Sequence, residues 1–320
     1  MIDYDAENWL GIMTRTRGSV LPRLTGRLMV AGAIGGFAIA LERVAEFSLP
    51  PVAHGLIGVA LGLLLVFRTN GAYDRFWEGR KLIGSIVIAT RDLMRQVVTQ
   101  VPERAGERAE LRRLVLAFFG LVVQRLREED DLEALSDWLN EVEREELAAS
   151  EHRAPVVATW ISSRLAEIAA ANDHPTTELR LNRMDDNLSD MLKALAGCER
   201  IRFTPVPFAY AHHIKLFLSL FCFSAPFAMV SGMGWWTPVA SVILTLALFG
   251  IDEIAVEIED PFGDDPNDLP LDEIGASLAR TTAEMLDARQ PVMARDSMSV
   301  RLRRGSPSRS EPLAESVTAA

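Results

Sequence analysis

Four long apolar stretches limit what this chain can fold into more than any other feature of its sequence. They cover residues 24–41, 52–67, 214–233 and 235–251. Each is close to the length of a membrane-spanning helix, which needs roughly 17–25 apolar residues. The two members of each pair are separated only by a short hinge containing Trp or Pro, as in membrane hairpins. We therefore predict four spanning helices in two hairpins; the alternative is four buried helices of a soluble protein.

Composition supports a membrane protein without a secretory leader. The 320 residues are 49% hydrophobic, with a net charge of -11 and a mean hydropathy of +0.13. A soluble domain this acidic would average below zero, so the apolar residues must be concentrated in segments. Cys198 and Cys222 are too far apart for a CxxC pair and form no disulfide framework. The N-terminus lacks a small-residue cleavage site, so we do not expect a signal peptide.

Basic residues gather on one side of the predicted spans. Those near the start of the first span and after the second are Arg15, Arg17, Arg23, Arg27, Arg68, Arg75, Arg80 and Lys81. Loops rich in Lys and Arg stay in the cytoplasm, so we expect both termini and the long middle region there. Trp9, Trp235 and Trp236 lie where interfacial aromatic residues are expected.

The remaining sequence predicts a helical cytoplasmic layer. Apolar residues recur at helical spacing between the hairpins, and residues 114–123 are too short to span a membrane, so we expect a buried core helix there. The expected organisation is an N-terminal segment with the first hairpin (1–81), a helical cytoplasmic region (82–211), the second hairpin (212–251), a cytoplasmic C-terminal segment (252–297) and a disordered tail (298–320).

The second span has two distinct faces at about 100° per residue. One narrow stripe contains Val52, Leu56, Ala60, Leu63 and Phe67. The opposite side contains Gly55, Gly58 and Gly62, which would permit close approach of another helix, and Gly32 and Gly36 of the first span could be the partners. The apolar stripe would then face lipid, another subunit or a pore.

No motif for group-transfer or hydrolytic chemistry occurs in the chain. There is no Gly-rich phosphate loop with Lys, no HExxH and no nucleophile elbow. His54, His212 and His213 lie at span ends, where an interfacial polar role is favoured over that of a metal ligand or base. We therefore expect neither an enzyme nor a nucleic-acid-binding protein.

Three motifs in order around the spans carry a family resemblance. They are "FRTNGAYDRFWEGRKLIG" after the second span, "GCERIRFTPVPFAYAHHI" before the third and "IEDPFGDDPNDLPLD" after the fourth. Over roughly residues 20–290 the chain resembles the bestrophin family, specifically its bacterial and plastid-type branch. The motif residues that we single out are Arg68, Tyr73, Trp77, Pro205 and Pro207.

The resemblance implies a fold and a function. It implies an all-α membrane protein that assembles as a pentamer around one axial pore, with the second span of each subunit lining a hydrophobic neck. The neck positions would be Val52, Leu56 and Ala60, and the small Ala60 would widen the neck on its cytoplasmic side. A second, cytoplasmic constriction would lie at Leu179 or Leu181. The family is associated with chloride and other anions, while its prokaryotic branch includes channels for monovalent cations.

The acidic turn after the fourth span resembles the calcium clasp of animal bestrophins. The carboxylates that could bind calcium are Asp260, Asp264, Asp265 and Asp268. Calcium takes six to eight oxygen ligands, and Pro266 both stiffens the loop and removes a ligand from the run. We favour a structural turn that docks the C-terminal segment over a divalent-ion site, and expect little calcium sensitivity and no cofactor.

These observations predict a homopentameric ion channel in a bacterial inner membrane that passes small monovalent ions. A non-conducting membrane scaffold and a secondary transporter are the alternatives. A transporter is disfavoured because the spans carry almost no polar groups at mid-membrane, where substrate would bind. The acidic excess would concentrate cations near the pore mouths, which opposes the family's preference for anions.

Overall fold

Every regular element that the computed structural model describes is a helix. The described residues are 5–101, 106–171 and 177–288. Their helices are α1 (Trp9–Thr14), α2 (Leu21–Ala45), α3 (Pro51–Gln100), α4 (Glu107–Arg127), η1 (Glu133–Leu135), α5 (Glu141–Ala148), α6 (Arg153–Ala170), α7 (Thr177–Phe203), α8 (Phe208–Met233), η2 (Gly234–Trp236), α9 (Thr237–Glu259) and α10 (Leu271–Asp287). The described residues up to Leu286 form one compact unit. The predicted disordered tail at 298–320 lies outside the described residues.

Three helical segments of the described chain are long and apolar enough to cross a membrane. They are Leu21–Ala45, Pro51–Gln100 and Phe208–Glu259. The third folds back on itself at η2, where Gly234 takes a φ of 52° that suits glycine. α8 and α9 pack against each other on either side of this turn. α2, the first part of α3, α8, and η2 together with α9 thus contain the four apolar stretches identified in the sequence.

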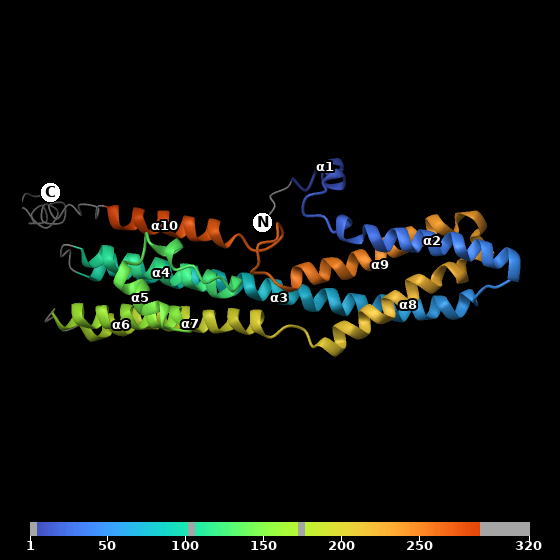
Figure 1. The fold of residues 1–320 in the computed structure, drawn as a ribbon. Helices are drawn as coiled ribbons and strands as arrows, with labels where there is room; N and C mark the ends of the chain where they lie inside the picture. The colour runs from blue at the N-terminus through green and yellow to red at the C-terminus, as the bar shows by residue number, and fades with distance from the viewer. Residues whose placement is uncertain (1–4, 102–105, 172–176, 289–320) are drawn as a thin grey trace, which may run out of the picture. The chain divides into compact units, whose positions relative to one another are not determined.

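The apolar helices are paired differently from the prediction. α2 packs mainly against α8 and α9, and α3 packs against the same two helices and α7 (Figure 1). A Cβ on Gly58 would lie 2.8 Å from the Phe221 ring of α8, and one on Gly35 would lie 2.6 Å from Pro238 of α9. The expected contact between the glycine faces of the first two spans is therefore wrong. The second hairpin, α8 and α9, supplies the packing partners of both α2 and α3.

α3 is much longer than the apolar stretch that begins it. Its 50 residues continue from the neck positions into the charged part of the chain, because no Pro interrupts the helix after its first turn. The predicted boundary at residues 81 and 82 falls inside this helix. The second half of α3 packs against α7 and α4, so one helix belongs to both the apolar and the charged bundle.

The charged bundle has its own hydrophobic core. The apolar run at residues 114–123 lies within α4, and Phe118 and Val122 there are fully buried. This confirms the prediction of a core helix. α7 adds Met184, Leu188 and Met191 to the same core. A fully buried Leu, Phe or Met contributes about 1.5–3 kcal/mol of hydrophobic stabilisation, so the bundle is well supported without the membrane helices.

The segment after α9 docks onto this bundle. The Phe262 side chain is fully buried in the core. The Leu269 N–H donates to the Pro261 carbonyl over 2.9 Å and closes the turn. A Cβ on Gly79 of α3 would lie 2.9 Å from Pro261 and 3.0 Å from the Phe262 ring. The absence of a side chain at Gly79 therefore lets the turn seat against α3, as the structural-turn prediction requires.

We predict that Gly79→Ala lowers the melting temperature of the detergent-solubilised protein. The added methyl would force Phe262 from its site, and overpacking of this kind costs about 1–3 kcal/mol. Gly84→Ala is the matched control on the same helix, since its Cβ would meet only the mobile end of Arg80 at 3.4 Å. Alanine is the better helix former, so the control should melt at the same or a higher temperature. Equal melting temperatures for the two variants would contradict the packing argument.

Candidate functional site

An unpartnered apolar stripe runs along the first turns of α3. Val52 is 87% exposed and Leu56 is 74% exposed in the isolated chain, and Ala60 is exposed as well. On the other side of the helix, Leu61 and Leu65 are buried against the neighbouring helices. The chain thus packs one face of α3 and leaves the predicted neck stripe free for contacts outside the subunit.

A buried ion pair lies just beyond the stripe. The Arg68 side chain is 4% exposed. Its Nη2 donates to Glu259 Oε2 over 2.8 Å, and its Nε lies 3.5 Å from Asp252 Oδ1. Both acids belong to α9. A buried charge without its partner is strongly destabilising, so this network fixes the position of α3 relative to α9.

Two further ion pairs connect α2 to the same helix. Arg23 Nη1 lies 3.1 Å from Glu257 Oε2, and Arg27 Nη1 donates to Glu253 Oε2 over 2.8 Å. The two arginines are one helical turn apart, and so are the two glutamates. The end of α9 therefore forms an acidic strip that binds arginines of both α2 and α3. Its members are Asp252, Glu253, Glu257 and Glu259.

Arg75 contacts backbone carbonyls rather than carboxylates. Its guanidinium donates to the carbonyls of Ile201, Thr204 and Glu259 at 2.6–3.2 Å. Two of these acceptors belong to the end of α7 and the loop that follows it. Arg75 thereby satisfies carbonyls at helix ends that have no partner within their own helix.

The other family-motif residues lie around this junction. Tyr73 and Trp77 are one turn apart on α3 and more than half exposed. Pro205 and Pro207 occupy the loop between α7 and α8, where Pro207 is the N-cap of α8. The Val206 N–H between them donates to Glu259 Oε1 over 3.2 Å. The motifs are therefore brought together, with the prolines beside the Arg68 network and the two aromatic side chains facing outward.

The two residues predicted for a second constriction differ in environment. Leu179 is 60% exposed, whereas Leu181 is half-buried and packs against the core of the charged bundle. Of the two, only Leu179 is available for contacts beyond the subunit.

The carboxylates of the acidic turn are directed to separate partners. Asp264 lies 3.0 Å from Arg127, Asp265 lies 3.3 Å from Arg23, and Asp260 pairs with Arg202. The fourth, Asp268, accepts the N–H of Asp265 over 2.7 Å. No three His, Cys, Asp or Glu side chains of the described residues are grouped to hold a metal. Three of the four carboxylates thus form ion pairs with arginines, and these pairs hold the turn in place.

The carboxyl group of Asp268 has a raised pKa. It is 5% exposed, and burial away from water raises its pKa to about 6. The hydrogen bond from Asp265 acts in the opposite direction, while the nearby acidic side chains raise the pKa further. The neutral form is therefore favoured in the folded protein compared with the unfolded chain.

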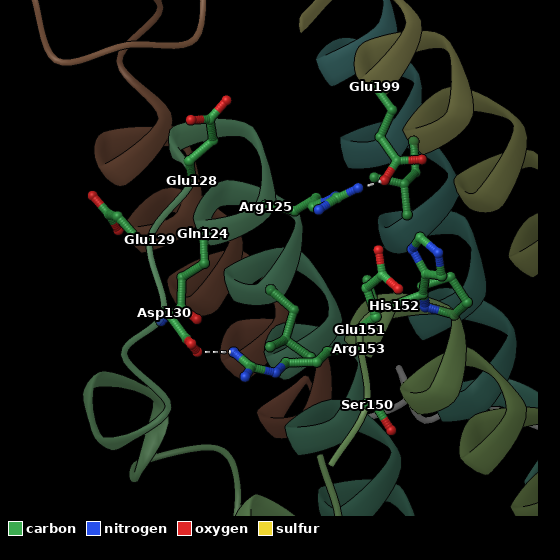
Figure 2. A pocket seen from close by; sticks show the side chains of 14 residues that line it. Gln124, Arg125, Glu128, Glu129, Asp130, Ser150, Glu151, His152, Arg153 and Glu199 are labelled. Carbon is green, nitrogen blue, oxygen red and sulfur yellow. Dashed lines mark hydrogen bonds and ion pairs between the residues drawn. The ribbon is translucent and has the colours of Figure 1, made fainter. Parts of the chain in front are cut away.

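A cavity of 330 Å³ lies apart from the stripe, between α4, α6 and α7. Figure 2 shows its charged lining, in which Arg125 binds Glu199 at 3.0 Å and Arg153 pairs with Asp130. None of the site residues predicted from the sequence lines it. Its arginines are already bound by acids of the same chain, so the cavity offers no evident site for an anion.

The sequence prediction missed the acidic strip of α9. Asp252, Glu253 and Glu257 directly follow the fourth apolar stretch, and the prediction assigned them to a cytoplasmic segment without partners. A signal was present: acids at helical spacing after one span and arginines at the same spacing in another are complementary.

The displaced titration of Asp268 predicts a pH dependence of stability. Its folded pKa, about 6, exceeds the unfolded value of about 4. The wild type therefore loses stability as pH rises between these values, by up to about 3 kcal/mol. Asp268→Asn should raise the melting temperature above that of the wild type at pH 7.5, because the amide keeps an acceptor for the Asp265 N–H and carries no charge. Near pH 4.5 the difference in melting temperature between variant and wild type should disappear. The exposed Asp137→Asn is the control; an equal gain at both pH values would refute the argument.

Known proteins match this chain over most of its length. The family model described as "Bacterial/Fungal Bestrophin protein" matches residues 1–284. The voltage-dependent anion channel-forming protein alr2987 of Nostoc sp. is 37% identical, over 91% of this chain and 95% of the relative. The voltage-dependent anion channel-forming protein YneE of Escherichia coli K12 is 34% identical, over 90% and 94%.

A solved structure supports the same assignment. The crystal structure of a bacterial bestrophin homolog from Klebsiella pneumoniae, carrying the mutation L177T, aligns with a TM-score of 0.78. Its sequence identity is 29%, and the alignment covers 83% of this chain and all of that one. The family model, the relatives and this structure agree with the motifs that meet around Arg68, and the chain belongs to the bacterial/fungal bestrophin family.

Proposed function

We propose that this protein is a homopentameric ion channel of the bacterial inner membrane. The observation that carries the proposal is the exposed apolar stripe at the start of α3, in a helix whose opposite face is packed. In a pentamer, Val52, Leu56 and Ala60 of each subunit would surround the axis and form the neck. The second constriction would involve Leu179, whose exposed side chain is free to approach the axis.

Channel activity also follows from the family. The relatives from Nostoc and Escherichia coli are named as voltage-dependent anion channel-forming proteins. Membership in the bestrophin family points to a channel in a membrane rather than to an enzyme. We therefore propose that small monovalent anions, chloride among them, are the permeant ions.

The proposed neck controls the passage of ions by gaining or losing water and does not bind the ions. Aliphatic side chains cannot replace the water shell of an ion, so an ion passes hydrated or partly hydrated, and an apolar ring closes by losing its water. Selection between ions at such a ring depends on size and on the field from charges elsewhere. The neighbouring arginines do not supply that charge directly, because Arg68 is buried against Asp252 and Glu259.

The orientation in the membrane follows from the charges at the helix ends. Arg23 and Arg27 at the start of α2, Arg68 and Arg75 beyond the neck, and the acidic strip of α9 lie on one side of the apolar segments. Lys and Arg remain on the cytoplasmic side, which supports our proposal that the charged bundle and both termini lie in the cytoplasm.

The test of the proposal is single-channel recording in a planar bilayer under a salt gradient. Purified pentamer should pass current with a reversal potential near the anion value. A value near that of the cation would contradict anion selectivity. Silence of a verified pentamer would favour the non-conducting scaffold. Repeating the recording in chelator should leave the current unchanged, because the acids of the turn are bound to arginines; current that appears only with micromolar calcium would refute this.

Substitution within the stripe gives a sharper test of the neck. Leu56→Asn should hydrate the ring and raise the open-state conductance several-fold, since a polar ring removes the cost of wetting. Leu56→Asp should raise the conductance and also shift the reversal potential toward the cation value, because five negative charges would surround the axis. Unchanged current in both variants would place the stripe away from the pore.

A further inference from the structure

The short N-terminal helix α1 leaves its four large apolar side chains exposed. Trp9 is 69% exposed, Leu10 65%, Met13 58% and Ile12 42%. No residue of α1 is buried. Four large apolar side chains within six residues form a contiguous patch that the chain itself does not cover, and such patches mark a protein or membrane contact.

The position of α1 is restricted by a contact just after it. The Gly18 carbonyl accepts a hydrogen bond from Asn267 Nδ2 over 3.0 Å, which ties the chain to the acidic turn. α2, the first membrane helix, begins three residues later at Leu21. The chain between Thr14 and Gly18 can reach about 14 Å at full extension. α1 is therefore held within a short length of chain from the point at which α2 begins.

An exposed cationic side chain, Arg17, follows α1 on the side toward α2, whereas the exposed acids Asp5 and Glu7 precede the helix. Arg23 and Arg27, farther along the chain, are bound by acids of α9. Arg17 is exposed, and none of the described acidic side chains forms an ion pair with it. A cationic side chain beside an apolar patch is the combination that binds the interface of a bilayer containing anionic lipids.

We propose that α1 lies in the headgroup region of the cytoplasmic leaflet, with its apolar side chains among the acyl chains and Arg17 at anionic headgroups. The patch is continuous with a lipid-level surface, because α2 leaves Leu21, Met29 and Val30 exposed along the same part of the chain. α1 would thus be a second membrane contact of each subunit, in addition to the spanning helices. This contact is separate from ion conduction.

Fluorescence quenching in lipid nanodiscs tests the proposal. Ile12→Cys would carry an environment-sensitive thiol dye, since the native Cys198 and Cys222 are fully buried. The label should lose roughly half of its emission to lipids brominated on their acyl chains, because interfacial helices reach about 5–10 Å into that boundary. Aqueous iodide should quench it little. Glu145→Cys on α5, an exposed position in the charged bundle, is the control and should respond only to iodide.

The other outcomes would overturn the proposal. Quenching by iodide alone would show that α1 is solvated. Protection from both quenchers would show that α1 is covered by protein, such as a second copy of this chain. Because the readout needs no current, the proposal can fail while the channel function holds, or the reverse.

A second series tests the role of the headgroups. Quenching by brominated lipids should be stronger in nanodiscs with phosphatidylglycerol than in those with phosphatidylcholine alone. Arg17→Gln should abolish this difference, whereas Arg180→Gln, an exposed arginine of α7, should preserve it. If wild type showed no dependence on lipid charge, the electrostatic part of the proposal would be wrong.

Discussion

The guanidinium of Arg68 is a full charge held almost entirely out of water, and the arrangement of the apolar bundle depends on its compensation. Desolvating a charge costs several kcal/mol, which only close and well-placed partners offset. Asp252 and Glu259 provide them, and Glu259 also binds the loop that precedes α8. One carboxylate thus joins α3, α9 and the entry to α8. The direction in which the exposed stripe of α3 points is set by this junction.

The two faces of α3 have opposite roles because the second hairpin occupies only one of them. Phe221 reaches over Gly58 at a distance that excludes any side chain at that position, while Leu61 and Leu65 fill the core beside it. The stripe that remains is uniform, apolar and free of hydrogen-bonding groups. A surface of this kind is stable in lipid or against copies of itself, and in a symmetric assembly the copies of one face surround a common axis.

The sequence predicted the helices well and their partners less well. Hydropathy and helical spacing identified the apolar stretches, the core helix at residues 114–123 and the stripe through Leu56, since each depends on local pattern. The contact between Gly58 and Phe221, and the link from Arg68 to Asp252, join positions far apart in the chain. A small residue in a span predicts a close helix contact, and a charged residue beside a span predicts an ion pair. Neither identifies the partner, because many residues of the chain could serve equally well. The contact between Gly79 and Phe262 could not be predicted for the same reason.

The continuity of α3 has a mechanical consequence. At 1.5 Å per residue, a helix of this length extends about 75 Å, from the exposed stripe into the charged bundle. A rod of that length converts small rotations into large displacements, and a tilt of about 5° about one end would move the other by about 6 Å. The Arg68 junction lies roughly a third of the way along and is suited to act as a fulcrum. A shift of the charged bundle would therefore displace the exposed stripe of α3 without any unwinding of the helix.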